Sequence, residues 1–420
     1  MGMRHVILVP MCLLAACAST RATQRGTDSA PPDAGVAQED EATRKARLTA
    51  LFERESQPSP DVTFTVLGKA VTVESSQPVT VTREEASASS TVSIGLGAST
   101  PMTCSLFDAP VQVGLLVTRT LAAVKAKVEV VQVRPGGIEV IEKSPAVFLD
   151  VAYAVTSNGA RSVGQLQLMA FASDDAPLFC SFDEPGYVKS FHRVAGGLAT
   201  SLARALAKPG DVPTFRTVDI TRIQGMPVGF GKTVWRKGKD GTGTFSTVGA
   251  MLVPRSPVDW LTTDQSTVAT VAKDGTLKEK RFVVVSNGEP DRELVLSRVK
   301  VGQYTYGGTV QGKALKGVLK THDKKDLPSD VLSARRIKRE LLTGKAKELK
   351  IEDYVPDANP AGLTVVTVRK EAGPNEVTME LGPMKLEATV DATGVTERAA
   401  LHAGPVTIVE ERAYNEGAVE

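Results

Sequence analysis

The feature that most limits how this chain can fold is the alternation of apolar and polar residues after residue 210. Segments 242–253, 265–286 and 291–312 follow this two-residue period, and short runs rich in Gly, Asn and Asp separate them. Successive side chains of a strand point to opposite faces of a sheet, so this period predicts antiparallel strands joined by tight turns. A sheet of this size must curl or close to protect its edges. The pattern therefore predicts a curved antiparallel sheet, or half-barrel, over residues 210–420.

One helix interrupts these strands, at residues 328–350. Ser329 is a suitable N-cap, and Gly344 stands where the helix could end or break. The apolar positions recur at helical spacing and form one stripe, which consists of Val331, Ala334, Ile337 and Leu341. This spacing predicts a long helix that packs on the curved sheet.

The region around this helix is basic. Residues 313–350 hold more than twice as many Lys and Arg as Asp and Glu. A basic amphipathic helix can rest on anionic lipid or on lipopolysaccharide phosphates. The candidate residues for such an anionic surface contact are Arg335, Arg336, Lys338 and Arg339. A solvated helix face explains the same charges and remains the alternative.

The chain before residue 210 has a different order of elements. Short alternating strands begin at residue 61, a helix is expected at about 110–125, and further strands follow. The last helix begins near Tyr187, and Pro209 with Gly210 stops it. Its apolar face repeats every three or four residues at Tyr187, Phe191, Val194, Leu198, Leu202 and Leu206. This order predicts an α+β sandwich in which two helices cover one face of an antiparallel sheet.

Length and composition suggest how these parts divide. A single hydrophobic core rarely grows past about 250 to 300 residues, so a chain of 420 residues is expected to form two domains. We place an α+β sandwich at 59–209 and a β-rich half-barrel-like domain at 210–420. Residues 18–58 are rich in Ser, Thr, Ala, Pro and charge, which predicts a disordered tether. A short helix over 40–54 is possible within it.

The N-terminus has the pattern of an export signal. Arg4 and His5 precede an apolar run over residues 6–14, and Leu14-Ala15-Ala16-Cys17 follows. The run is too short to cross a bilayer, which needs about 20 apolar residues. This arrangement resembles the lipobox of bacterial lipoproteins, and the resemblance implies that Cys17 becomes the acylated first residue once the signal peptide, residues 1–17, is removed. An ordinary signal with an accidental cysteine is the alternative.

The lipobox resemblance also implies a location. Several acyl chains together hold a protein stably at a bilayer surface, so the mature chain would be anchored to the membrane rather than span it. Ala18 stands where lipoproteins retained in the inner membrane usually have Asp. The family analogy therefore favours the cell envelope, at the outer membrane and facing the periplasm.

Two cysteines remain after the signal and the acylation site are set aside. Cys12 lies in the predicted signal peptide, which leaves Cys104 and Cys180. In an oxidising envelope an even pair is read as a disulfide. Two buried free thiols are one alternative. A reactive Cys180 with His192 as its base is another, because both lie near the same junction between a strand and a helix.

The sequence shows no constellation for catalysis, metal binding or cofactor binding. The histidines have no partners at metal-ligand spacing. The glycine-rich run Gly225–Thr233 has the wrong spacing for a phosphate-binding loop and stands in strand-like sequence. A net charge of +2 excludes neither nucleic acid nor membrane by itself, but only 5% of the residues are aromatic, which argues against surfaces on which bases could stack. We therefore expect no cofactor, no metal site, no catalytic residues and no nucleic-acid partner.

Two weaker resemblances rest on element order. The order over 61–208 resembles the PsbP, Mog1 and DcrB group of small α/β domains. The order over 211–416, with the strand pair "KLEATVDATGVTERAAL", resembles LolA/LolB-type and DUF3108-type envelope proteins. The second resemblance implies a concave apolar surface under a helix that could receive an acyl chain or a partner segment.

These observations lead to one main hypothesis of function. The chain is interpreted as a lipid-anchored envelope protein, more consistent with a binding or scaffolding role than with an enzyme, whose curved sheet binds a hydrophobic ligand or an envelope protein. A hydrolase acting on an envelope polymer or ester, with a site not visible in the sequence, is the alternative. A purely architectural lipoprotein is the third possibility.

Overall fold

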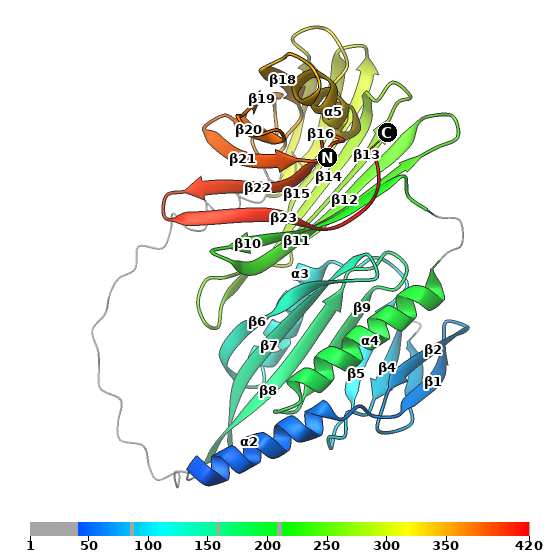
Figure 1. Ribbon diagram of the computed structural model, residues 1–420, viewed down its shortest axis with the longest axis vertical. Helices are drawn as coiled ribbons and strands as arrows, with labels where there is room; N and C mark the ends of the chain where they lie inside the picture. The colour runs from blue at the N-terminus through cyan, green and yellow to red at the C-terminus, as the bar shows by residue number, and fades with distance from the viewer. Residues whose placement is uncertain (1–40, 85–87, 158–159, 208–211, 420) are drawn as a thin grey trace.

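Two large antiparallel sheets lie one above the other in the computed structural model, with helix α3 between them (Figure 1). The structure describes residues 41–84, 88–157, 160–207 and 212–419. The predicted signal peptide, Cys17 and most of the predicted tether lie outside these residues. The chain is an α+β protein rich in antiparallel strands, which confirms the fold class predicted from the alternation of residues.

The first sheet has seven strands in the order β3-β4-β5-β9-β8-β7-β6. Their bounds are β3 Thr80–Glu84, β4 Ser89–Ile94, β5 Met102–Phe107, β6 Glu129–Ile141, β7 Ser144–Ser157, β8 Ala160–Phe171 and β9 Leu178–Asp183. A separate hairpin, β1 Asp61–Val66 with β2 Lys69–Glu74, and helix α2 Glu41–Ser56 precede this sheet in the chain.

Helices α3 (Val113–Lys125) and α4 (Val188–Leu206) cover opposite faces of this sheet. The apolar face of α4 packs in one cluster with Phe148, whereas α3 packs in another with Val147 and Leu149. Successive residues of β7 point to opposite faces, so the two clusters lie on either side of the sheet. The prediction that both helices cover one face is therefore wrong. The hairpin β1–β2 shares the face of α4, and the second sheet packs over the face of α3.

The second sheet has fourteen strands and is strongly curved (Figure 1). Its order is β17-β16-β15-β14-β13-β12-β11-β10-β23-β22-β21-β20-β19-β18. The bounds are β10 Phe215–Ile223, β11 Met226–Lys237, β12 Gly243–Pro254, β13 Trp260–Val271, β14 Leu277–Ser286, β15 Glu289–Lys300, β16 Gln303–Val310, β17 Lys313–Lys320, β18 Glu348–Asp353, β19 Thr364–Lys370, β20 Glu376–Leu381, β21 Met384–Val390, β22 Thr396–Ala403 and β23 Val406–Gly417. Neighbouring strands in this order are consecutive along the chain except at β10–β23, which joins the two halves, and β17 and β18 form the two edges.

A short helical segment lies in the hollow of the curved sheet. It consists of α5 (Asp330–Arg336) and one π-helical stretch, η1 (Ile337–Leu342). The side chain of Ser329 accepts a hydrogen bond from the backbone N–H of Leu332 at 3.3 Å, as expected of an N-cap. The predicted apolar stripe is buried at Val331, Ala334, Ile337 and Leu341.

The segment is shorter than the predicted helix over 328–350, since residues 348–350 already belong to β18. The chain turns tightly at Gly344, where a Cβ atom would lie only 2.5 Å from the carbonyl oxygen of Glu340. A residue with a side chain would clash there, so the glycine permits the close approach that ends the helical segment.

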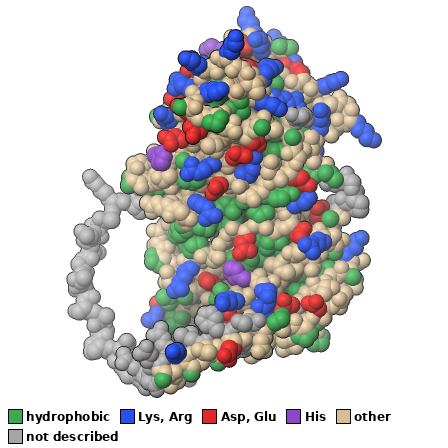
Figure 2. All heavy atoms as spheres, in the orientation of Figure 1, with side chains coloured by type: hydrophobic (Ala, Val, Ile, Leu, Met, Phe, Trp, Pro, Cys, Tyr) green, Lys and Arg blue, Asp and Glu red, His purple; other side chains and the backbone are tan. Residues whose placement is uncertain are grey.

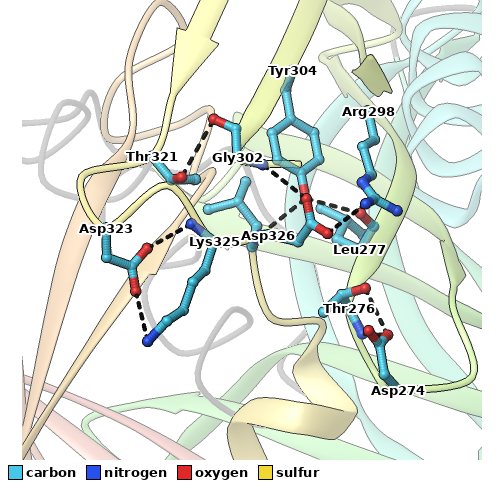
Figure 3. A network of polar contacts seen from close by, with 11 residues as sticks. Asp274, Thr276, Leu277, Arg298, Gly302, Tyr304, Thr321, Asp323, Lys325 and Asp326 are labelled. Atoms are coloured by element: carbon cyan, nitrogen blue, oxygen red, sulfur yellow. Dashed lines mark hydrogen bonds and ion pairs between the residues drawn. The ribbon is translucent and has the colours of Figure 1, made fainter. Parts of the chain in front are cut away.

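A buried tyrosine fixes the approach to α5 (Figure 3). The hydroxyl of Tyr304 donates a hydrogen bond to the carbonyl oxygen of Leu277 at 3.0 Å and accepts one from the N–H of Leu327 at 2.9 Å. Nearby, Arg298 and Asp326 form an ion pair at 2.8 Å. These contacts tie the connection between β17 and α5 to the strands beneath it.

The two sheets share a hydrophobic cluster and a helix cap. The cluster combines residues of α3 and the first sheet with Phe230, Leu252 and Trp260 of the second sheet. Asp264 in β13 accepts hydrogen bonds from the backbone N–H groups of Gly114 and Leu115, both at 2.7 Å. The N-cap residue of α3 makes no side-chain cap of its own, so the second sheet supplies the acceptors that the first turn of α3 needs.

Candidate functional site

The concave face of the second sheet is filled by the protein's own side chains. Ile337 and Leu341 pack in one hydrophobic cluster with Phe282, and Val331 packs in a second cluster with Tyr354. All five residues are almost fully buried. This packing occupies the apolar surface that the half-barrel resemblance implied would receive an acyl chain.

An open apolar groove of about 490 Å³ lies instead on the first sheet, between α3 and strands β7 and β8. We call it the α3 groove. Its apolar lining comes from Val124 and Val128 on the helix side and from Val155 and Leu166 on the strands. Its volume falls within the usual range for small-molecule sites.

One wall of the α3 groove holds a fixed polar pair. The hydroxyl of Tyr153 donates a hydrogen bond to the carboxylate of Asp183 at 2.5 Å. Burial, reinforced by this bond, raises the pKa of Tyr153 to about 12. The phenol therefore stays neutral and committed to Asp183, and it offers the groove an aromatic ring rather than a reactive group.

Two cations stand at the same groove. Arg119 lies on α3 and Lys127 just beyond its end, and both are exposed. Neither side chain forms a hydrogen bond or an ion pair with any residue in the described ranges. The arrangement combines an apolar lining with positive charge at its margin, which suits a molecule with an apolar body and an anionic end.

The structure joins Cys104 and Cys180 in a disulfide bond. The two residues face each other directly in the register of β5 and β9, and both are fully buried. The ring of His192, the base considered for a reactive Cys180, stacks on Phe148 with the ring centroids 4.0 Å apart. Burial lowers the pKa of His192. A disulfide-bonded Cys180 offers no thiol for nucleophilic chemistry.

Three of the four basic residues proposed for an anionic surface are only partly exposed. Arg336 and Arg339 both contact Glu340, at 3.1 and 3.0 Å, and Arg335 donates to the carbonyl oxygen of Val419 at 3.1 Å. Arg339 is the exposed member of the set, whereas Lys338 is half-buried. Figure 2 shows Lys and Arg side chains mixed with acidic ones around this end of the molecule. Contact with an anionic surface stays a prediction.

Three other structural observations bear on the expected absences. The run Gly225–Thr233 forms a turn and the first part of β11, so the strand-to-helix transition of a phosphate-binding loop is missing there. In the described ranges, no three His, Cys, Asp or Glu residues gather as metal ligands would. No helix among those residues is both long and apolar enough to cross a bilayer.

Sequence reasoning missed a buried acidic pair on the concave face of the second sheet. Asp219 in β10 and Glu410 in β23 are both buried. Burial raises the pKa of Asp219 to about 6, and burial together with the charge of Asp219 raises the pKa of Glu410 well above its usual value. The neighbouring Arg412 is held by Asp391 at 2.7 Å. No signal in the sequence marked this pair, because both strands hold other polar and charged residues as well.

No protein-family model matches this chain, and no curated protein matches it. One similar solved structure is a beta-barrel-like protein of the domain of unknown function DUF1849 from Brucella abortus, with 12% identity over 49% of this chain and 98% of that chain and a TM-score of 0.37. Another is a DUF1089 family protein from Pseudomonas aeruginosa, with 18% identity over 40% of this chain and 87% of that chain and a TM-score of 0.26. These similarities assign no ligand and no activity to the chain.

Proposed function

We propose that this protein is a non-enzymatic, lipid-anchored binding protein of the cell envelope that holds a single-chain anionic amphiphile in the α3 groove. The observation that carries the proposal is the open apolar groove with two cations, Arg119 and Lys127, that have no partner among the described residues. The lipobox at Cys17 supports the envelope location, because an anchored protein would work close to membrane amphiphiles.

The groove accounts for both ends of such a ligand. Valine and leucine side chains would cover the apolar body, and each Å² of apolar surface removed from water contributes about 25 cal/mol. The two cations would attract the anionic end. They are exposed, so each is expected to add less than about 1 kcal/mol. Affinity therefore comes mainly from the apolar body, and the charges select an acid over a neutral analogue.

Binding can be measured with 11-(dansylamino)undecanoic acid, whose fluorescence rises in an apolar site. The protein is the full chain carrying Cys17→Ser, so that neither an attached acyl group nor detergent competes for the groove. Ala123 lines the groove and is exposed, so Ala123→Trp should fill it and weaken binding at least tenfold. Ala122 is also exposed but does not line the groove, which makes Ala122→Trp the matched control.

The charge contribution is tested separately. Replacing Arg119 and Lys127 together with Gln should weaken binding of the acid several-fold while leaving the corresponding neutral alcohol unaffected. Raising the salt concentration should reproduce that loss in the wild type. Equal affinity of the acid for wild type and Ala123→Trp would exclude the α3 groove as the site.

The anchor is tested in cells. The wild type should incorporate an alkynyl palmitate label and fractionate with membranes, whereas Cys17→Ser should do neither. A labelled Cys17→Ser variant would show that lipid is attached elsewhere or that the lipobox prediction is wrong.

A further inference from the structure

A second pocket, of about 420 Å³, lies between the two sheets, away from the α3 groove. We call it the inter-sheet pocket. The β6–β7 turn at Glu142 and Lys143, the end of α4, and strands β10, β11 and β23 form its walls. Its lining is mainly charged and polar, so the pocket differs in chemistry from the α3 groove.

Lys232 of β11 is a buried cation at this pocket. Its side chain is only 3% exposed, and its ammonium group donates to Asp174 at 2.8 Å and to Ser144 at 3.3 Å. An ammonium group has three hydrogen-bond donors, and in the described part of the chain only these two partners are present. The pKa of Lys232 is lowered, because burial, together with the charge of Arg216, outweighs the opposing effects of Asp174 and Asp175.

Arg216 of β10 is the second cation, and part of its hydrogen-bonding capacity is unused among the described residues. The side chain is 15% exposed, and its Nε atom is buried with no hydrogen-bond partner in the described part of the chain. Its guanidinium lies 3.6 Å from the carboxylate of Glu416, which is close enough for an ion pair but too long for a hydrogen bond. A guanidinium carries five donors, and leaving buried donors unpaired is costly.

The register of the strands brings these two cations together. Arg216 faces Val234, and Lys232 faces Val218, so the two lie on one face of the sheet as diagonal neighbours. Such neighbours are within reach of long side chains. Two buried like charges repel each other, and an anion placed between them would remove that repulsion.

Three of the acidic side chains that line the pocket already have closer cations, and Asp175 lines it as well. Glu416 binds Lys143 at 2.6 Å, and Glu142 binds Arg204 at 2.6 Å. The carboxylate of Asp174 is held by Lys232. Arg216 is therefore the least neutralised of these cations, even though acidic side chains surround it.

We propose that the inter-sheet pocket is a binding site for the phosphate or carboxylate group of a small molecule, held by Arg216 and Lys232. A planar guanidinium can bind either oxyanion through two parallel hydrogen bonds, and Lys232 would supply its remaining donor as a point charge. The volume of the pocket is sufficient for a small metabolite-sized ligand. The inference does not depend on the α3 groove, which lies at a different surface.

Isothermal titration calorimetry of the full chain carrying Cys17→Ser, with inorganic phosphate and with acetate as probes, tests this site. The wild type should bind at least one of them saturably. Arg216→Gln should weaken binding by about tenfold or more, which corresponds to the loss of a charge-assisted hydrogen bond. Arg222 lies on the same strand outside the pocket and donates to the carbonyl oxygen of Gly225, so Arg222→Gln is the matched control and should bind like wild type.

A second variant keeps the test valid if Arg216→Gln fails to fold. Ala207 is exposed at the pocket, so Ala207→Trp should obstruct binding without removing a charge. Preference for phosphate would identify a phosphate-bearing ligand, and preference for acetate a carboxylate. No saturable binding of either anion, or undiminished binding by Ala207→Trp, would overturn the proposal. Ala123→Trp should leave anion binding unchanged, which separates this site from the α3 groove.

Discussion

The disulfide between Cys104 and Cys180 should contribute a large share of the stability of the first sheet. The bond closes a loop with a sequence separation of 76 residues. In the chain-entropy treatment, a loop of this length lowers the entropy of the unfolded chain by about 15 cal/mol/K, or about 4.5 kcal/mol at 25 °C. Folded domains are typically stable by only about 5 to 15 kcal/mol, so reduction should leave the first sheet close to its limit of stability.

Urea unfolding with and without a reducing agent measures this contribution. With a typical slope of about 2 kcal/mol per molar urea, reduction should move the unfolding midpoint of the first sheet down by about 2 M. Trp235 and Trp260 both belong to the second sheet, so tryptophan fluorescence cannot follow the first sheet by itself. Hydrogen exchange of the β5, β8 and β9 amides, read by mass spectrometry, reports on the strands next to the bond.

Two controls connect the result to the loop. The double variant Cys104→Ala with Cys180→Ala should unfold near the reduced wild type and should not respond to the reducing agent. It should lie slightly lower, because two buried sulfur atoms are lost. Oxidised and reduced wild type that unfold at the same urea concentration would refute the reasoning.

Three further predictions concern buried polar groups. Asp264→Ala removes the acceptors of the Gly114 and Leu115 N–H groups, so it should lower the free energy of unfolding by about 1 to 3 kcal/mol at pH 7 and speed hydrogen exchange in α3. Unchanged hydrogen exchange in α3 would contradict the capping role. Glu410 keeps its proton in the folded protein, whereas the unfolded chain releases that proton above about pH 4.5. The wild type should therefore lose stability relative to Glu410→Gln as the pH rises above this value. The loss should reach up to about 1.4 kcal/mol per pH unit until the pKa of Glu410 in the folded protein is passed. Urea unfolding of both proteins between pH 4.5 and 8 checks this, and parallel pH profiles would count against it. Tyr304→Phe removes a hydroxyl that both donates and accepts a buried hydrogen bond, so it should lower the free energy of unfolding by about 1 to 3 kcal/mol in the same urea assay. A change below about 0.5 kcal/mol would show that the two hydrogen bonds add little to stability.

Local patterns in the sequence predicted the elements that depend on local physics. The apolar repeat of α4 and the N-cap at Ser329 both appear in the structure, because helix periodicity and capping involve residues within a few positions of each other. The turn signals likewise predicted an antiparallel, β-rich chain.

The arrangement of these elements could not be predicted in the same way. An apolar stripe shows which side of a helix is buried but not which face of a sheet covers it, so α3 and α4 were placed on one face. The cap of α3 left no local signal, because Asp264 stands 150 residues from Gly114. Sequence alone favoured but could not decide a Cys104–Cys180 bond, since the decision depends on the register of β5 against β9.

The candidate sites were harder still to predict. Lys232 lies within Gly225–Thr233, which was considered as a nucleotide motif, and Arg216 resembles an ordinary polar residue of a strand. Their significance comes from burial and from unused donors, and both arise only when the two sheets pack together. The α3 groove is likewise formed by one helix and two strands that come together only in the fold.

The strand order of the second sheet affects how that sheet can be assembled. Strands β10–β17 and β18–β23 each form a ladder of neighbouring hairpins, and hairpins form within microseconds. The two ladders share backbone hydrogen bonds only along one seam, β10 with β23, where Phe215 pairs with Gly417. Contacts between residues so far apart in sequence form late, because closing a long loop costs entropy before any bond is gained. The slow step in building this sheet is therefore expected to be the meeting of two preformed halves along that seam.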